Sequence, residues 1–262
     1  MFFSVPSWAL ALIIFGVVVG AALLGGLIGR FLRERSDRLK EPIGVLQAAL
    51  LGLVGLILAF GLSLAVGRYE DRRAALVAEA NAIGTAYLRG QTIAEPQRTE
   101  SLGLMRRYAD LALVLSREVP GSVRMARTTA AESLIQQRLW SLAGESLAHA
   151  PTDSAPRLYV DSLNDMIDQQ TVRLSALNNR VPGPVLDLEV LSAAIALGLL
   201  ALYLAVLGRG HVIVVLAAGL VTLLLLVTFD LDRPTRGLIT IPTTPLRALR
   251  ASMALPPPAH GP

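Results

Sequence analysis

Residues 43–67 read IGVLQAALLGLVGLILAFGLSLAVG, a run that contains no ionisable residue. A helix rises 1.5 Å per residue, so a run of this length extends beyond the roughly 30 Å hydrocarbon core of a bilayer. The run therefore predicts a membrane-spanning helix, and the rest of the fold can be worked out from what lies on either side of it.

Three further uncharged runs have the same character, at residues 8–29, 190–208 and 212–229. The first is longer than the apolar core of a signal peptide, and no basic residue precedes it, so we expect it to be retained as an anchor. Only Arg209, Gly210 and His211 separate the last two runs, and a connection this short requires an antiparallel hairpin. The sequence thus predicts four spans.

The segment between the two pairs of spans is different, because charged residues appear every few positions and apolar residues recur at helical spacing. We expect the second span to continue as a helix through Arg89, and further helices from Glu95-Pro96 to Val119, over residues 130–147, and over residues 157–180. No stretch shows the alternation of a strand.

The predicted fold class is all-α: an integral membrane protein with four transmembrane helices in two hairpins and an inserted helical bundle. Residues 1–67 form the first hairpin, residues 68–184 the extramembrane bundle, residues 185–229 the second hairpin, and residues 230–262 a C-terminal tail.

Composition excludes several classes of function. Hydrophobic residues make up 53% of the chain and charged residues 17%, below the roughly 25% charged of a soluble domain. The chain has no cysteine, which excludes thiol chemistry and disulfides. Between Arg68 and Arg180, 14 arginines are matched by 13 acidic residues, so this domain is nearly neutral and nucleic acid is not an expected partner.

The sequence offers no catalytic constellation. His149, His211 and His260 are isolated, so no paired-histidine metal site is expected, nor any cofactor or enzymatic activity. No ionisable residue lies inside a predicted span, which argues against a proton relay in the membrane. Asp230 and Asp232 are closest, and we interpret them as part of a solvated cluster with Arg233 and Arg236; a coupling-ion site is the alternative.

Two pairs of glycines, Gly16 with Gly20 and Gly25 with Gly29, have the spacing that allows membrane helices to approach closely. We interpret both pairs as packing motifs within or between subunits.

The second span also carries a candidate pore stripe, because one of its faces presents small, apolar and hydroxyl side chains at spacings of three and four. Leu56 and Phe60 from several subunits could form a hydrophobic constriction of the kind that gates channels by dewetting. Ordinary helix packing is the alternative reading of the same periodicity. The residues of this stripe are Gly52, Leu56, Phe60, Ser63 and Gly67.

Three stretches resemble the bestrophins, which are pentameric ion channels, and more closely the bacterial membrane proteins described as bestrophin-like. Residues 58–73 read LAFGLSLAVGRYEDRR, and with EANAIGTAYLR at 79–89 they are similar to the pore-lining neck helix of bestrophins. Residues 105–111 read MRRYADL and resemble a stretch in the bestrophin cytosolic helices. Residues 229–237, FDLDRPTRG, lie where bestrophins have a proline-containing turn after the last span.

The resemblance implies a fold, an assembly and a place in the cell: a homo-oligomer, pentameric in bestrophins, in a bacterial inner membrane with a cytoplasmic bundle. It places Phe60 on a neck aromatic position and Leu56 one turn before it. Gly52 falls where bestrophins have a bulky residue. The five Arg and Lys of residues 30–41 favour the opposite sidedness by the positive-inside rule, so orientation stays open. Only Asp230 and Asp232 match the bestrophin calcium-binding cluster, so we expect no calcium gating by that route.

The leading hypothesis is therefore a homo-oligomeric ion channel whose partners are copies of itself, inorganic ions and membrane lipid. Arg68, Arg72 and Arg73 follow the second span and could concentrate anions at a pore mouth, or could simply extend to lipid headgroups. The alternative hypothesis is a non-conducting membrane sensor or scaffold whose helical bundle binds a ligand or a protein partner.

Overall fold

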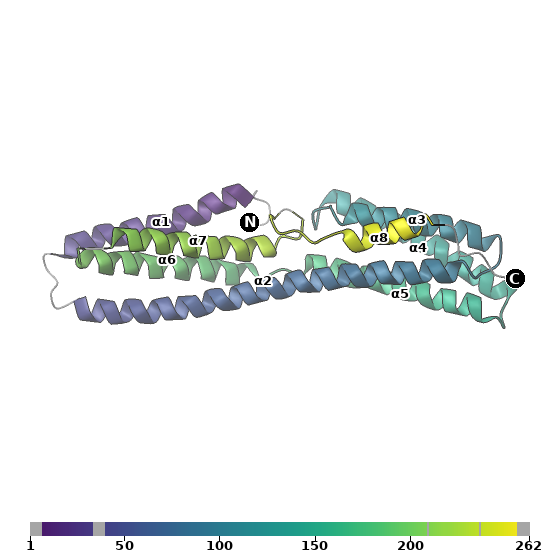
Figure 1. The fold of residues 1–262 in the computed structure, drawn as a ribbon, viewed down its shortest axis with the longest axis horizontal. Coiled ribbons are helices and arrows are strands. Elements are labelled where there is room, and N and C mark those ends of the chain that lie inside the picture. Colours follow the sequence, from purple (N-terminus) through teal and green to yellow (C-terminus); the bar gives the residue numbers. More distant parts are fainter. Residues whose placement is uncertain (1–6, 34–39, 209, 236, 256–262) are drawn as a thin grey trace. The chain divides into compact units, whose positions relative to one another are not determined.

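The computed structural model describes residues 7–33, 40–208, 210–235 and 237–255. Within these ranges the regular structure is helical and no strand occurs, which confirms the all-α fold class for the described part of the chain (Figure 1). The helices are α1 Ser7–Leu32, α2 Lys40–Gly90, α3 Gln97–Leu115, α4 Val123–His149, α5 Ser154–Asn178, α6 Gly183–Val206, α7 His211–Leu231 and α8 Thr244–Ser252.

Four helical stretches are long and apolar enough to cross a membrane: Trp8–Leu32, Glu41–Gly90, Ser154–Val206 and Val212–Leu231. They correspond to α1, α2, α6 and α7. The third stretch also includes α5, but its uncharged run begins at Val190, within α6. Since α2 continues to Gly90, the predicted extension of the second span through Arg89 is confirmed.

Helix boundaries in the remaining segment differ from the sequence prediction by several residues. The largest difference is at α4, which begins at Val123 rather than near residue 130. Ser122 explains the earlier start, because its side-chain oxygen accepts a hydrogen bond from the Met125 N–H at 3.1 Å and so caps the first turn. At the start of α3, the Glu95 carboxylate accepts from the Thr99 N–H at 3.1 Å.

The chain divides into two compact units. The first, here called the membrane unit, comprises the described residues up to Tyr69 together with Arg180–Ile239, and contains α1, the first part of α2, α6 and α7. The second, here called the bundle unit, comprises Glu70–Asn179 and the described residues from Thr240 onward, and contains the rest of α2 with α3, α4, α5 and α8.

In the membrane unit, α1 packs against α6 through small residues. A Cβ added to Gly25 would overlap the backbone of Gly198 in α6, and one added to Gly29 would overlap the backbone of Leu202. A Cβ on Gly16 or Gly20, by contrast, would have no neighbour within 4 Å. Within one subunit, therefore, only the second predicted glycine pair is a packing motif.

The bundle unit has a core of aliphatic side chains, methionines and tyrosines from all of its helices, including the C-terminal α8. Leu246 of α8 and Met253, the residue that follows this helix, are fully buried, and the Tyr87 hydroxyl donates to the Met253 carbonyl at 3.1 Å. At the surface, the Arg250 guanidinium pairs with Asp110 of α3 at 2.6 Å. The C-terminal segment, predicted only as a tail, thus supplies a helix to the bundle.

Candidate functional site

The α2 helix has two contrasting faces within the membrane unit. On one face Val54, Leu58 and Ala65 are buried, and the first two belong to the core shared with the other helices of that unit. The opposite face carries the predicted pore stripe. Leu56 is 53% exposed and Phe60 63% exposed, and the other three stripe residues, Gly52, Ser63 and Gly67, are exposed as well. The described part of the chain therefore leaves the whole stripe uncovered.

Behind the stripe, a buried carboxylate presses against α2. A Cβ added to Gly61 would overlap the carboxylate of Glu189 from α6, so this carboxylate lies directly on the Gly61 backbone. Glu189 is fully buried, and neither of its carboxylate oxygens has a hydrogen-bond partner among the described residues. Only a glycine at position 61 leaves room for the group.

The position of Glu189 relative to the second span is a feature that the sequence did not reveal. Gly61 lies six residues before Gly67, the end of the uncharged run, which is about 9 Å along the helix axis. The carboxylate therefore lies at the depth of the second span. Glu189 directly precedes the predicted span 190–208, so it is not an ionisable residue inside that span. What the sequence could not show is that its side chain packs against a different span, at Gly61 of α2.

The three arginines after the span have different surroundings. Arg72 is only 1% exposed and donates hydrogen bonds to the carbonyls of Ala176 at 3.3 Å and Asn179 at 2.8 Å. These carbonyls belong to the C-terminal end of α5, where a cation is favoured by the helix dipole. Arg73 is exposed and pairs with Glu70 at 3.6 Å, and Arg68 is partly exposed.

The acidic residues after the fourth span are buried, so their interpretation as a solvated cluster was wrong. The two Asp230 carboxylate oxygens accept from the backbone N–H groups of Leu238 at 2.9 Å and Ile239 at 2.7 Å. Asp232 accepts from the Val181 N–H at 3.1 Å. Both carboxylates thus hold loop backbone beside α7, and Arg233 is buried with them. Arg236 lies outside the described residues.

A polar network runs through the interior of the bundle unit. Arg173 of α5 pairs with the buried Glu79 of α2 and also donates to the Ala112 carbonyl at 3.2 Å. In the same interior, Gln136 donates to the Tyr108 hydroxyl at 3.1 Å and to the Gln170 side-chain carbonyl at 2.8 Å. The network connects four helices of the bundle unit, so it can fix the register in which those helices pack.

Glu132 of α4 completes this network and is its most unusual member. Its Oε2 accepts from the Gln170 amide at 2.5 Å, whereas its Oε1 has no hydrogen-bond partner among the described residues. Burial is the main cause that raises the pKa of Glu132 to about 7; the hydrogen bond from Gln170 and the charge of Arg173 oppose the shift, and the nearby Glu79 adds to it. The bundle interior therefore contains a carboxyl that titrates near neutral pH.

The described residues of this region provide an exposed apolar stripe and several buried polar contacts. Across the described ranges, no group of three or more His, Asp or Glu side chains is placed to hold a metal ion. Glu189, Glu132 and the burial of Arg72 were not predicted from the sequence. The available signal was weak: Glu132 and Glu79 fall on the apolar faces of their helices, but a pattern of single residues does not show whether such a carboxylate is paired.

Comparison with known proteins gives one family and one fold. The family model of the bestrophin-like domain matches residues 12–246. No curated protein matches the chain in sequence. A crystal structure of a bacterial bestrophin homologue from Klebsiella pneumoniae is 14% identical with a TM-score of 0.62, covering 90% of this chain and 95% of that one.

Two further crystal structures agree with this fold. A single-residue variant of the Klebsiella pneumoniae homologue is 13% identical with a TM-score of 0.65, covering 90% of this chain and 97% of that one. A variant of a membrane protein is 15% identical with a TM-score of 0.63, covering 92% and 97%. At these identities the matches establish a common fold over nearly the whole chain.

Proposed function

The chain belongs to the bestrophin-like family, and from this membership we propose that it is an ion channel that works as a homo-oligomer in a bacterial inner membrane. The family match extends through both units, since it covers residues 12–246. The four apolar helices supply the membrane-crossing part that a channel requires.

We further propose that α2 lines a pore between subunits, in a ring of five by analogy with the bestrophins that the sequence resembles. The observation that carries this proposal is the contrast between the two faces of α2, with Leu58 buried and Phe60 63% exposed. A single subunit uses one face of this helix for its own packing. The other face, which carries the stripe, is left for symmetry-related copies or for the conduction path.

In this arrangement Leu56 and Phe60 form the narrowest, dewetting part of the pore, and Ser63 and Gly67 line the path beyond it. Gly52 widens the path on the other side. Arg68 and Arg73 lie at the mouth, where their charge raises the local concentration of anions. Arg72 takes a different role from the one first expected, because its guanidinium is engaged with the end of α5.

The first experiment is the mass of the purified complex by light scattering with the detergent contribution subtracted, followed by single-channel recording in planar bilayers. A mass near five subunits and discrete currents are the expected results. Phe60→Ala and Leu56→Ala should raise conductance or open probability, because each removes bulk from the constriction.

Matched controls are Phe31→Ala on α1 and Leu220→Ala on α7, which shorten side chains of the same type outside α2 that are at least as exposed as Phe60 and Leu56. Currents that change as much in these controls as in the α2 variants would contradict the assignment of the pore to α2. A dimer without conductance would contradict the channel itself and favour a sensor or scaffold.

A further inference from the structure

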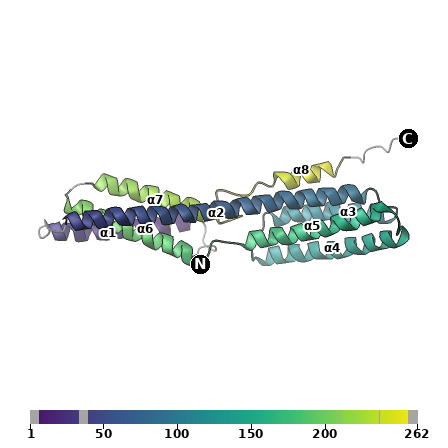
Figure 2. The same ribbon diagram turned by 90° about the horizontal axis from the view of Figure 1, so that it is seen from below.

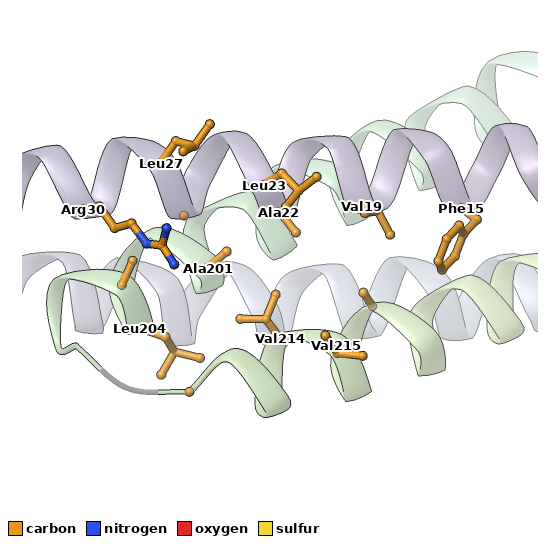
Figure 3. A pocket seen from close by; sticks show the side chains of 14 residues that line it. Phe15, Val19, Ala22, Leu23, Leu27, Arg30, Ala201, Leu204, Val214 and Val215 are labelled. Carbon is orange, nitrogen blue, oxygen red and sulfur yellow. The ribbon is translucent and has the colours of Figure 1, made fainter.

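Two buried carboxyls distinguish the interior of the bundle unit from the groove of the membrane unit. That groove, of about 320 Å³ between α1, α6 and α7, has no acidic residue among the described side chains that line it (Figure 3). In the bundle unit α3, α4 and α5 run alongside the part of α2 that belongs to this unit (Figure 1, Figure 2). Glu79 of α2 and Glu132 of α4 are fully buried in its interior. Carboxylates at such depth need a compensating charge or a proton.

One guanidinium acts on both carboxyls. Arg173 of α5 pairs directly with Glu79 and donates to the Ala112 carbonyl of α3 at 3.2 Å. It is also close enough to Glu132 for its positive charge to favour the ionised form of that carboxyl, while the charge of Glu79 disfavours it. With both carboxyls ionised, two negative charges would share one positive charge. The cluster is therefore neutral only when one carboxyl holds a proton.

The hydrogen bonds assign that proton to Glu132. Burial raises the pKa of both carboxyls, that of Glu132 to about 7, but only Glu79 accepts a hydrogen bond from the guanidinium of Arg173. Among the described residues Glu132 accepts only from the neutral amide of Gln170, at 2.5 Å. A charged donor favours the ionised form of its acceptor more strongly than a neutral donor does. Glu132 is therefore the carboxyl that gains and loses a proton near neutral pH.

The other ionisable groups on the surrounding helices stay neutral or are engaged elsewhere. Tyr108 of α3 lies in the same interior, and burial raises its pKa, so its hydroxyl keeps the proton. Arg72 of α2 donates to carbonyls at the C-terminal end of α5. Arg250 of α8 pairs with Asp110 at the surface. Loss of the proton from Glu132 therefore changes the cluster from neutral to negative.

We propose that the interior of the bundle unit is a proton-binding site at Glu132, and that the bound proton decides how firmly Arg173 holds Glu79 of α2. With the proton bound, Arg173 serves Glu79 alone and ties α5 to α2. When the proton leaves, the Glu132 carboxylate competes for the same guanidinium, and the buried negative charge attracts water. The contact between α5 and α2 then weakens.

The site reaches conduction through α2, a consequence that rests on the proposed channel function. Glu79 belongs to the same helix, Lys40–Gly90, as the stripe residues Leu56 and Phe60. A change in how the bundle unit holds α2 shifts the equilibrium between conformations of this helix. Proton binding at Glu132 then becomes a signal by which pH regulates the channel.

The proton site is tested without measuring conduction, by infrared difference spectroscopy of the full chain in lipid between pH 6 and pH 8. The wild type should lose the C=O band of a protonated carboxyl as pH rises, and Glu132→Gln should not. Glu145→Gln is the matched control, because it removes a carboxylate from the surface of the same helix and should behave as the wild type. In Glu79→Gln the band should disappear at lower pH, because a neighbouring negative charge is removed.

Hydrogen exchange of the α2 amides around Glu79 tests the hold on this helix. After correction for the pH dependence of intrinsic exchange, the equilibrium constant for opening should rise about tenfold from pH 6 to pH 8 in the wild type. This factor is the linkage expected for a carboxyl whose pKa is about 7 in the closed form and the ordinary 4.5 in the open form. Glu132→Gln should show no such rise.

Single-channel recording at the same two pH values tests the regulation. The open probability should differ between them in the wild type and in Glu145→Gln, and should be the same in Glu132→Gln.

Each part of the proposal can be overturned. A carboxyl band that is absent from the wild type, or that titrates equally in Glu132→Gln, would overturn the proton site. Equal acceleration of α2 exchange in the wild type and in Glu132→Gln would overturn the control of α2, and currents with the same pH dependence in both would overturn the regulation. If the spectra and the exchange are as expected but the wild type carries no current, the proton site stands and the channel function fails.

Discussion

Replacing Glu132 with glutamine should make the bundle unit more stable at alkaline pH and leave it almost unchanged at acidic pH. In the folded protein burial raises the pKa of Glu132 from the ordinary 4.5 to about 7. Between these values the folded chain keeps the proton and the unfolded chain releases it, so the free energy of unfolding falls as pH rises. The loss is complete above about pH 7.

The magnitude follows from the size of the pKa change. One pKa unit corresponds to about 1.4 kcal/mol, so a carboxyl with these two pKa values reduces the free energy of unfolding by about 3 kcal/mol at pH 8. Glu132 is fully buried, so solvent screening does not reduce this value. Glutamine is neutral at every pH, and its side-chain carbonyl can accept the same hydrogen bond from Gln170. At pH 8 the Glu132→Gln variant should therefore have a free energy of unfolding that is higher than that of the wild type by this amount.

The assay uses the fluorescence of Trp140, one of only two tryptophans in the chain and the one in α4. With Trp8→Phe as background, urea unfolding of the detergent-solubilised protein at pH 5 and pH 8 gives the stability of the bundle unit. Glu145→Gln is the control, because it removes a carboxylate from the surface of the same helix and should change stability by less than about 1 kcal/mol at either pH.

Two results would refute the reasoning. A stabilisation of Glu132→Gln that is the same at pH 5 and pH 8 would show that Glu132 does not titrate between them. A loss of stability at pH 8 would show that the network needs the carboxylate as an anion.

Three other substitutions test the packing and the buried charges. Gly25→Ala should lower the free energy of unfolding of the detergent-solubilised protein by about 1–3 kcal/mol, because the added Cβ overlaps the backbone of α6. An unchanged melting temperature would contradict the close contact. Arg173→Met should lower the free energy of unfolding by about 3–5 kcal/mol, because it leaves the Glu79 carboxylate buried without its partner. Adding Glu79→Gln to the same chain should restore part of this free energy. Gly61→Ala should destabilise the wild type more than a Glu189→Ala background, and equal effects in this double-mutant cycle would show that the two residues do not touch.

The sequence alone determined the class of the protein. The four apolar runs, the helical spacing of residues 68–184 and the resemblance of residues 58–73 were enough to predict an all-helical membrane protein similar to the bestrophins, and the family match agrees. These features are readable because run length and helical periodicity depend only on neighbours along the chain. The exposure of the stripe residues Leu56 and Phe60 could be measured only in the structure.

Only the tertiary structure decided which side chains meet across helices. Gly16 and Gly25 have the same sequence spacing to a second glycine, yet only Gly25 contacts another helix. Glu189 lies outside the apolar run of its own helix α6, but its side chain packs against the apolar run of α2. Arg72 and Asp230 look like surface charges until their backbone partners, 104 and 8 residues away, are placed beside them. The physical reason is that burial and pairing depend on groups distant in sequence, whereas a helix forms from residues that are close in it.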